Sequence, residues 1–275
     1  MIKCIFTNIK NEHRYLEEWI NYHIRLGFNK FILYEDSGSI SHLDIIDKYH
    51  DIIDIDFYDY VLEKDSLEFK DLTCFKHIIK NYNNIDWIIK LDPDEYIVLP
   101  ENQTIDDLLY NISDDIHQLT FMWKLYNANG FINEPSHDIY SLRDTYIVPI
   151  DVDNLATYFD SNTSSNNYRI GKSILKYKYF LKEYQDKMDS LISPGYPHRF
   201  IDTEDFVSND IFINHYITKS FEEFYNRLKD KGEYNKEYYR KIGDFFVLNP
   251  DLIAKIPEIE DKFGVDIFTF KTKIN

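Results

Sequence analysis

The chain of 275 residues is 44% hydrophobic and 17% aromatic, so it can bury a large core and is not an intrinsically disordered segment. Its 48 acidic and 31 basic residues leave a formal charge of −17, which argues against general nucleic-acid binding and against attachment to anionic lipid by charge. The two cysteines, Cys4 and Cys74, adjoin apolar residues, which predicts reduced, buried thiols. No apolar run reaches the ~18 residues that cross a bilayer and no secretory signal pattern opens the chain, so we expect a soluble, cytoplasmic protein.

The first hundred residues alternate between short apolar runs and amphipathic segments. The apolar runs predict strands at residues 2–6, 31–34, 52–58 and 87–91. Between them the spacing predicts helices at residues 11–26, 43–49 and 67–81, the first ending at Gly27. This strand–helix repeat is typical of an α/β fold with a mostly parallel central sheet flanked by helices.

After Pro100 the pattern changes, and helices become dominant toward the end of the chain. Residues 105–112 predict a helix, and residues 118–126 and 211–216 predict strands. The low-complexity stretch 160–167 predicts a mobile surface loop. Ser220 and Glu223 have the spacing of a capping box, which predicts a helix start. With no convincing linker, one domain with a helical C-terminal extension is the simplest organisation.

Polar and acidic residues follow three of the predicted strands, at Thr7-Asn8, Glu35-Asp36 and Asp92-Pro93-Asp94-Glu95. Ligands of such sheets bind at the carboxyl ends of the strands, so this edge is the predicted site. Mg²⁺ and Mn²⁺ take oxygen ligands, commonly one or two carboxylates together with substrate phosphates. Asp92 and Asp94 therefore suit a metal that binds a nucleotide diphosphate, although an acidic turn after a strand is the alternative.

A metal held by two aspartates often takes a further ligand from elsewhere in the chain. His215, at the end of a predicted strand, is the candidate, and His198 competes with it. A leaving diphosphate needs positive charge, which Lys172 or Lys219 can supply unless they are solvated surface residues. The chain has no Gly-rich phosphate loop, no G-x-S-x-G sequence and no zinc-binding spacing. Phosphate binding by a glycine loop, a serine hydrolase and a zinc site are therefore without support.

Five segments, in this order, resemble GT-A glycosyltransferases of the family 2-like and family 92-like groups. The first, residues 11–28, is similar to N-E-x-x-Y-L-x-E-W-x-x-Y-H-x-x-x-G, and residues 34–39 resemble the Y-D-x-x-S turn. Residues 87–96 resemble the W-x-x-x-x-D-x-D-E-F metal motif, and residues 123–130 the W-x-x-F-G-x-x-G stretch. Residues 214–224 resemble the H-Y-x-x-K-S-x-E-E-F block.

The resemblance implies a GT-A domain over residues 1–232, with residues 233–275 as a helical extension packed on it. It implies a hexosyltransferase of glycan biosynthesis that uses Mn²⁺ or Mg²⁺ and a UDP-sugar. By position, Asp94 binds the metal directly, Asp92 contacts the ribose or the metal through water, and His215 completes the metal site. Those expected to line the donor pocket are Thr7, Asn11, Glu12 and Asp36, with Lys172 and Lys219 toward the diphosphate.

We expect an inverting transfer to a hydroxyl of a glycan or another acceptor, in which a carboxylate removes the hydroxyl proton. Glu134 and Asp138 are the candidate bases, although either can be a solvated loop acid. Trp123 is the candidate for stacking on the acceptor sugar, with core packing as its alternative. Ser41 and Tyr126-Asn127 depart from the family pattern, which leaves acceptor identity open.

Two other functions remain open from the residues. One is a GT-A module that binds a nucleotide sugar without turnover, which the intact D-x-D-E sequence and His215 disfavour. The other is a metal-dependent nucleotidyltransferase, which normally has a Gly-rich basic loop near its N-terminus, whereas residues 7–14 contain no glycine.

Overall fold

A computed structural model of the protein describes residues 1–36, 38–60, 67–136, 141–150, 170–179, 181, 198–200, 210–230 and 236–267. The low-complexity stretch at residues 160–167 and the candidate base Asp138 lie outside these residues.

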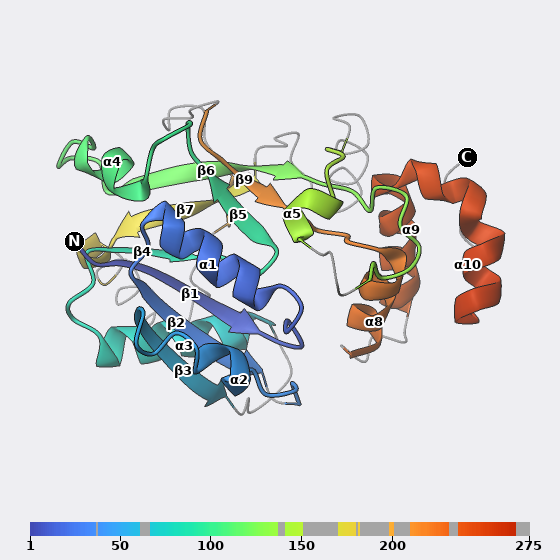
Figure 1. Cartoon of the computed structure of the whole chain (residues 1–275), viewed down its shortest axis with the longest axis horizontal. Coiled ribbons are helices and arrows are strands. Elements are labelled where there is room, and N and C mark those ends of the chain that lie inside the picture. The colour runs from blue at the N-terminus through green and yellow to red at the C-terminus, as the bar shows by residue number, and fades with distance from the viewer. Residues whose placement is uncertain are drawn as a thin grey trace. The chain divides into compact units, whose positions relative to one another are not determined.

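The strands that the structure describes form one nine-stranded sheet (Figure 1). They are β1 (Lys3–Ile9), β2 (Lys30–Asp36), β3 (Asp54–Tyr60), β4 (Trp87–Lys90), β5 (Glu95–Val98), β6 (Gln118–Leu125), β7 (Ile170–Lys176), β8 (His198–Phe200) and β9 (Phe212–His215). The described helices are α1 (Leu16–Leu26), α2 (Leu43–Ile46), α3 (Leu67–Asn81), α4 (Ile105–Tyr110), α5 (Leu142–Thr145), α8 (Phe221–Asp230), α9 (Lys236–Leu248), the 3₁₀ turn η2 (Pro250–Lys255) and α10 (Ile256–Phe263).

The sheet has a parallel part and an antiparallel part. Strands β3, β2, β1 and β4 lie in this order and are parallel. Beyond β4 the sheet continues as β7, β6, β9 and β5, with β8 paired to β7. Strand β7 runs antiparallel to β4, β6 and β8. The predicted α/β fold is confirmed: the sheet is parallel across β3, β2, β1 and β4 and turns antiparallel at β7.

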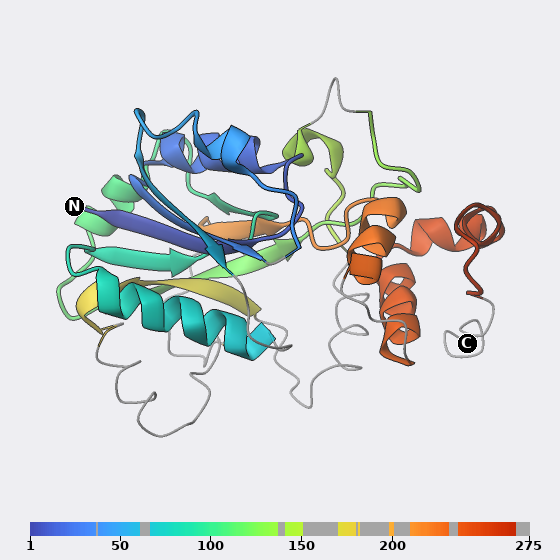
Figure 2. The ribbon, with the colours of Figure 1, turned by 90° about the horizontal axis from the view of Figure 1, so that it is seen from below.

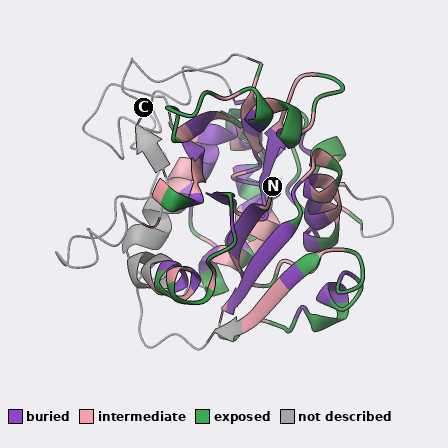
Figure 3. Ribbon diagram, turned by 90° about the vertical axis from the view of Figure 1, so that its left-hand side faces the viewer, coloured by how far each residue is buried: buried purple, intermediate pink, exposed green. Residues whose placement is uncertain are grey.

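Helices cover both faces of the parallel strands (Figure 2). On one face, Cys74, Phe75 and Ile78 of α3 pack in a buried cluster with Cys4 and Phe6 of β1. On the other face, the buried ring of Trp19 in α1 lies 5.9 Å from the ring of Phe31. Burial of these strands on both faces explains their continuous apolar sequences. Figure 3 shows the central strands as buried residues, with exposed residues gathered on loops and outer helix faces.

Several predicted elements are confirmed, and the start of α1 differs. Helix α3 has the predicted bounds, and Gly27 ends α1 with a left-handed φ of 108°. Helix α1 begins at Leu16 instead of residue 11, because Asn11 has φ of 56° and cannot continue a right-handed helix. Strands β5 and β7 were not predicted, because their sequences lack the regular alternation of apolar and polar residues that marks a strand.

The described residues cluster into two compact units. The first comprises residues 1–123 and 169–214, and the second comprises residues 124–168 and 215–275. Within the second unit, α8 shares an apolar core with the later helices. Phe221 of α8, for example, packs its ring 5.2 Å from that of Phe245 in α9. The domain boundary expected at residue 232 stays a prediction.

Both cysteines are buried and unlinked, as predicted. Among the described helices, none combines the length and the apolar composition needed to cross a membrane.

Gly171 permits the close approach of β7 to β6. A Cβ atom at this position would lie 2.0 Å from the carbonyl oxygen of Phe121. Because a strand backbone cannot move aside without shifting the pairing, Gly171→Ala should lower the free energy of unfolding by about 3 kcal/mol or more. Chemical denaturation measures this loss. Gly38→Ala is the control, because its Cβ would meet nothing within 4 Å and only its left-handed φ of 77° would strain the alanine, by about 1 kcal/mol. It should lose less, and equal losses would contradict this reading.

Candidate active site

The candidate site lies where the direction of chain connection reverses in the parallel sheet. Strand β1 pairs with β2 on one side and with β4 on the other. The carboxyl ends of these three parallel strands lead into Asn11, Asp36 and Asp92 at the same edge. A crevice at the carboxyl ends of strands at such a reversal is where α/β sheets bind ligands. The edge predicted from the sequence is therefore present.

The loop Asp92-Pro93-Asp94-Glu95 is held by its own atoms and by one lysine. The Asp92 backbone N–H donates to Oε2 of Glu95 at 2.9 Å. The Nζ atom of Lys172 lies 2.7 Å from Oδ2 of Asp92 and 3.0 Å from Oε2 of Glu95. Lys172 and Glu95 are fully buried, whereas the Asp92 side chain is 37% exposed. The buried Lys172 and Glu95 side chains therefore hold the loop, and Asp92 is its partly exposed carboxylate.

Helix α1 supports the same loop from a second direction. The Trp19 indole N–H donates to the carbonyl oxygen of Glu95 at 2.9 Å, and the Tyr22 hydroxyl donates to that of Ile97 at 2.6 Å. Both aromatic residues belong to the first motif of the resemblance. Their contacts give a structural reason for the tryptophan and tyrosine in that motif, since they fix the strand that follows the aspartates.

The charged groups in this cluster shift each other's pKa values. Burial raises the pKa of the Glu95 carboxyl to about 8, with Lys172 opposing the shift and Asp92 and Asp94 reinforcing it. Burial lowers the pKa of Lys172, but the charges of Asp92 and Glu95 outweigh it and raise the pKa above its ordinary value. The Lys172 ammonium group therefore stays charged, and surface solvation is excluded for it.

The described donors fit a divalent cation only in part. Within the described ranges no three His, Cys, Asp or Glu side chains are grouped so that they can hold a metal ion. Asp92 and the largely buried Asp94 offer hard oxygen ligands, and Lys172 already neutralises one Asp92 oxygen. Magnesium or manganese often takes one or two carboxylates and completes its shell with water and phosphate. The aspartates therefore fit a cation that arrives with an anionic substrate.

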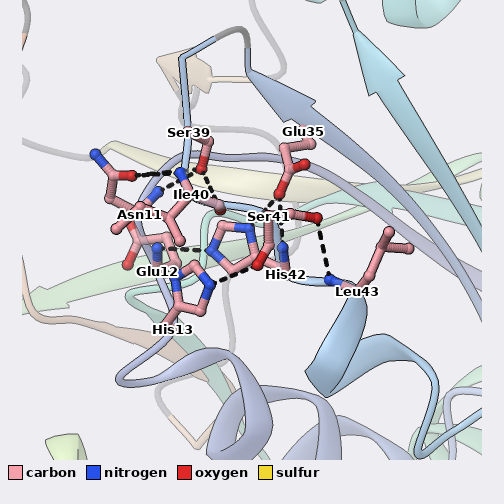
Figure 4. Close-up of polar contacts among 9 residues, drawn as sticks. All are labelled: Asn11, Glu12, His13, Glu35, Ser39, Ile40, Ser41, His42 and Leu43. Carbon is pink, nitrogen blue, oxygen red and sulfur yellow. Dashed lines mark hydrogen bonds and ion pairs between the residues drawn. The ribbon is translucent and has the colours of Figure 1, made fainter.

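The loop after β1 is tied to the turn after β2 (Figure 4). The Asn11 N–H donates to the Ser39 hydroxyl at 3.0 Å, and the Ile40 N–H donates to Oδ1 of Asn11 at 3.0 Å. The Glu12 N–H donates to Nε2 of His42 at 2.9 Å. Thus Asn11 and Glu12 lie beside the turn after Asp36. Thr7 is different, because its buried hydroxyl donates to the neighbouring Asn8 carbonyl.

The second unit contains His215, Lys219 and Glu134. His215 ends β9 and is largely buried, and its carbonyl accepts the Tyr126 N–H at 3.0 Å. Lys219 is largely buried with a left-handed φ of 54°, so it is not a solvated surface lysine either. The Glu134 N–H donates to Oε2 of Glu222 at 2.8 Å, which places this half-buried residue at the start of α8.

The predicted capping box fixes the chain next to Lys219. The Ser220 hydroxyl donates to Oε2 of Glu223 at 2.7 Å, and the Glu223 N–H donates to the Ser220 oxygen at 3.2 Å. The Tyr146 hydroxyl donates to the same Glu223 oxygen at 2.6 Å and accepts the Ser220 N–H at 2.8 Å. Lys219 thus adopts a costly conformation beside a rigid helix start, which is common at functional positions.

Two remaining candidates have simpler outcomes. Trp123 lies half-buried on β6. His198 lies on β8 opposite Lys172 in register.

Sequence reasoning placed Glu35 and Glu95 at the site edge without assigning them a supporting role, and it missed His42. Glu95 directly follows the two aspartates, so its position in the motif was a usable signal. His42 gave no signal, because its partners lie 7 and 30 positions away along the chain.

No family model matches the chain. Among curated proteins, a glycosyltransferase family 92 protein of Oryza sativa subsp. japonica is 28% identical over 111 residues, 40% of this chain and 18% of that protein. Another from Ricinus communis is 23% identical over 146 residues, 50% of this chain and 25% of that protein. The chain is similar to family 92 glycosyltransferases. This similarity confirms the resemblance seen in the motifs, and the matched stretches span a quarter or less of those relatives.

Two solved structures are also similar to the chain. TarS of S. aureus, residues 1–349, is 14% identical, with 90% of this chain and 71% of that chain covered and a TM-score of 0.44. HddC from Yersinia pseudotuberculosis is 10% identical, with 66% of this chain and 80% of that chain covered and a TM-score of 0.31. These scores are too low to support a statement about fold or function.

Removal of the buried lysine should destabilise the protein strongly. Lys172→Met would leave the Asp92 carboxylate and the buried Glu95 carboxyl without their shared cationic partner, which should lower the unfolding free energy by about 3–5 kcal/mol in urea denaturation. Lys48→Met is the matched control, because Lys48 pairs with Glu17 at 2.6 Å with both side chains about half exposed. The control should lose far less, because solvent screens an exposed ion pair. A similarly small loss in Lys172→Met would refute a supporting role for Lys172.

Proposed function

We propose that the protein is a glycosyltransferase that moves a sugar from a nucleotide diphosphate sugar, a UDP-sugar in particular, to a hydroxyl acceptor. The observation that carries this proposal is the D-x-D-E loop, supported by buried Lys172, at the carboxyl edge of the parallel strands. The similarity to family 92 glycosyltransferases agrees with it.

The donor is proposed to bind along the edge formed by β2, β1 and β4. Asn11, Glu12 and Asp36 would contact the nucleoside, because the hydrogen bonds between the loops after β1 and β2 hold them together. Asp92 and Asp94 would hold Mn²⁺ or Mg²⁺ against the diphosphate. When bound there, the cation supplies the positive charge that a diphosphate leaving group needs. In a chain with a charge of −17, such compensation would favour the binding of an anionic substrate.

The transfer is proposed to be inverting. The acceptor oxygen forms a bond to the anomeric carbon while the bond from that carbon to the diphosphate oxygen breaks, and attack from the opposite face inverts the configuration. The hydroxyl proton passes to a carboxylate, for which Glu134 and Asp138 are the proposed candidates. Trp123 is proposed to stack on the acceptor sugar.

The roles of His215 and Lys219 rest on their positions in the fifth motif. We propose His215 as a further metal ligand and Lys219 as a cation for the diphosphate. Two structural features support Lys219, namely its burial and its left-handed backbone. A lysine in that conformation costs about 1–2 kcal/mol, which glycine would avoid.

UDP release tests the proposed activity. The protein is incubated with Mn²⁺, a panel of UDP-sugars and mixed acceptors, and UDP is measured. Asp94→Asn should reduce release at least about a hundredfold, the size of loss expected when charge stabilisation is removed from a reaction centre. Asp114→Asn is the control, since this exposed residue lies outside the proposed site. Unchanged release in Asp94→Asn would overturn the metal assignment.

The same assay separates the alternatives. Tight UDP binding without release toward any acceptor would favour a binding module. Pyrophosphate formed from UTP and a sugar phosphate would favour a nucleotidyltransferase.

Lys219 offers a test in which stability and binding change in opposite directions. Lys219→Gly should raise the free energy of unfolding by about 0.5–1 kcal/mol, because glycine adopts the left-handed φ without strain. It should also weaken UDP binding about tenfold or more through loss of a charge-assisted hydrogen bond. Lys219→Gln keeps the strain and loses the charge, so it should weaken binding with no gain in stability. UDP binding that is unaffected in both variants would remove Lys219 from the donor site.

A further inference from the structure

His42 joins the turn after β2 to the loop after β1 through both ring nitrogens (Figure 4). Its Nδ1 atom lies 2.6 Å from Oε1 of Glu35, and its backbone N–H donates to the same oxygen at 2.8 Å. Its Nε2 atom accepts the Glu12 backbone N–H at 2.9 Å. Because Nε2 accepts a hydrogen bond, the ring must be neutral with its proton on Nδ1. His42 is fully buried, so water cannot replace either partner.

The segment held by His42 contains two of the proposed nucleoside contacts. Asn11 precedes Glu12 and has a left-handed φ of 56°, a conformation that its surroundings must maintain. His13 follows Glu12 and stacks on the His42 ring, with centroids 3.9 Å apart and planes inclined by 20°. The Nε2 atom of His13 also lies 2.8 Å from the Ser41 carbonyl oxygen. Residues 11–13 are thus fixed to the turn that contains His42.

We propose that His42 is a positioning residue whose neutral ring holds residues Asn11 and Glu12 in the nucleotide-binding conformation, so that protonation of His42 weakens nucleotide binding. This inference rests on the proposed function, because it assigns regulation by pH to the same donor site. Protonation would place an N–H on Nε2, opposite the N–H of Glu12. Two donors facing each other repel, and the loop after β1 would separate from the turn.

The surroundings of His42 determine whether the bridge is lost at low or at high pH. Burial lowers the pKa of His42 below its ordinary value, and the nearby His13 lowers it further, while Glu35 and Glu12 oppose the shift. A histidine whose pKa is lowered by folding stabilises its surroundings when neutral. The bridge is therefore intact at neutral pH and is lost as the pH falls through the lowered pKa.

Glutamine at position 42 separates positioning from titration. Its side-chain amide oxygen reaches the place of Nε2 and can accept the Glu12 N–H, but it does not titrate. His50→Gln is the matched control, because His50 is 52% exposed in its side chain and pairs only with nearby Asp47 among the contacts described for it. The terminal phosphate of UDP titrates in the same range, so His42→Gln also provides the reference for the ligand's own pH dependence.

The experiment measures UDP binding by calorimetry at constant Mn²⁺ between about pH 7.5 and about pH 5, where histidine titrates. Hydrogen exchange of the residue 11–13 amides is followed over the same range and expressed as protection. At a pH about one unit below the pKa of His42, where about a tenth of the molecules keep the bridge, the unsubstituted protein and His50→Gln should have lost about tenfold more affinity than His42→Gln. Protection of the Glu12 amide should fall in parallel, and only where His42 is present.

Each other outcome overturns the proposal in a recognisable way. Equal pH dependence of UDP binding in the unsubstituted protein and His42→Gln would show that His42 does not control the site. Glu12 protection that is independent of pH would show that the bridge does not open. In a third outcome, protection falls with pH but UDP binds at no pH. The pH-sensitive bridge would then exist, but the donor site, and with it the proposed function, would be refuted.

Discussion

The ion pair of Lys172 with Asp92 and Glu95 is the interaction on which the candidate site depends. Moving an ammonium group and a carboxylate out of water costs several kcal/mol for each ion, which only close and well-directed partners offset. Lys172 has such partners at 2.7 Å and 3.0 Å, and one of its carboxylates also accepts the Asp92 backbone N–H. The buried charges therefore define the conformation of the acidic loop. They also hold the partly exposed Asp92 side chain in place.

A second support, made of a neutral group, fixes the other half of the edge. His42 bridges a carboxylate and a backbone N–H, and its ring is excluded from solvent. Both supports use buried polar groups to hold loops at the ends of parallel strands, where regular hydrogen bonding has ended. They differ in their response to pH. The Lys172 ammonium group is stabilised by its carboxylate partners, whereas the His42 bridge requires an uncharged ring.

The second unit uses local geometry for the same purpose. Glu223 accepts hydrogen bonds from Ser220 and from Tyr146, and these contacts fix the start of α8 next to the left-handed Lys219. The aromatic core of α8 and α9 keeps that helix in place. A strained residue can persist only where its neighbours are held in this way.

The amino-acid sequence by itself determined the features that depend on nearby residues. The bounds of α3, the left-handed Gly27 and the Ser220–Glu223 capping box follow from periodicity and terminal residues, because each involves contacts within a few positions. The order of strand, loop and helix also predicted which acidic residues reach the carboxyl edge of the parallel strands. Only the tertiary structure decided that β7 inserts antiparallel between β4 and β6, which brings Lys172 to Asp92 across 80 positions. It likewise decided that His42 accepts the Glu12 N–H, since a single sequence records neither the pairing of distant strands nor the water that folding removes from a side chain.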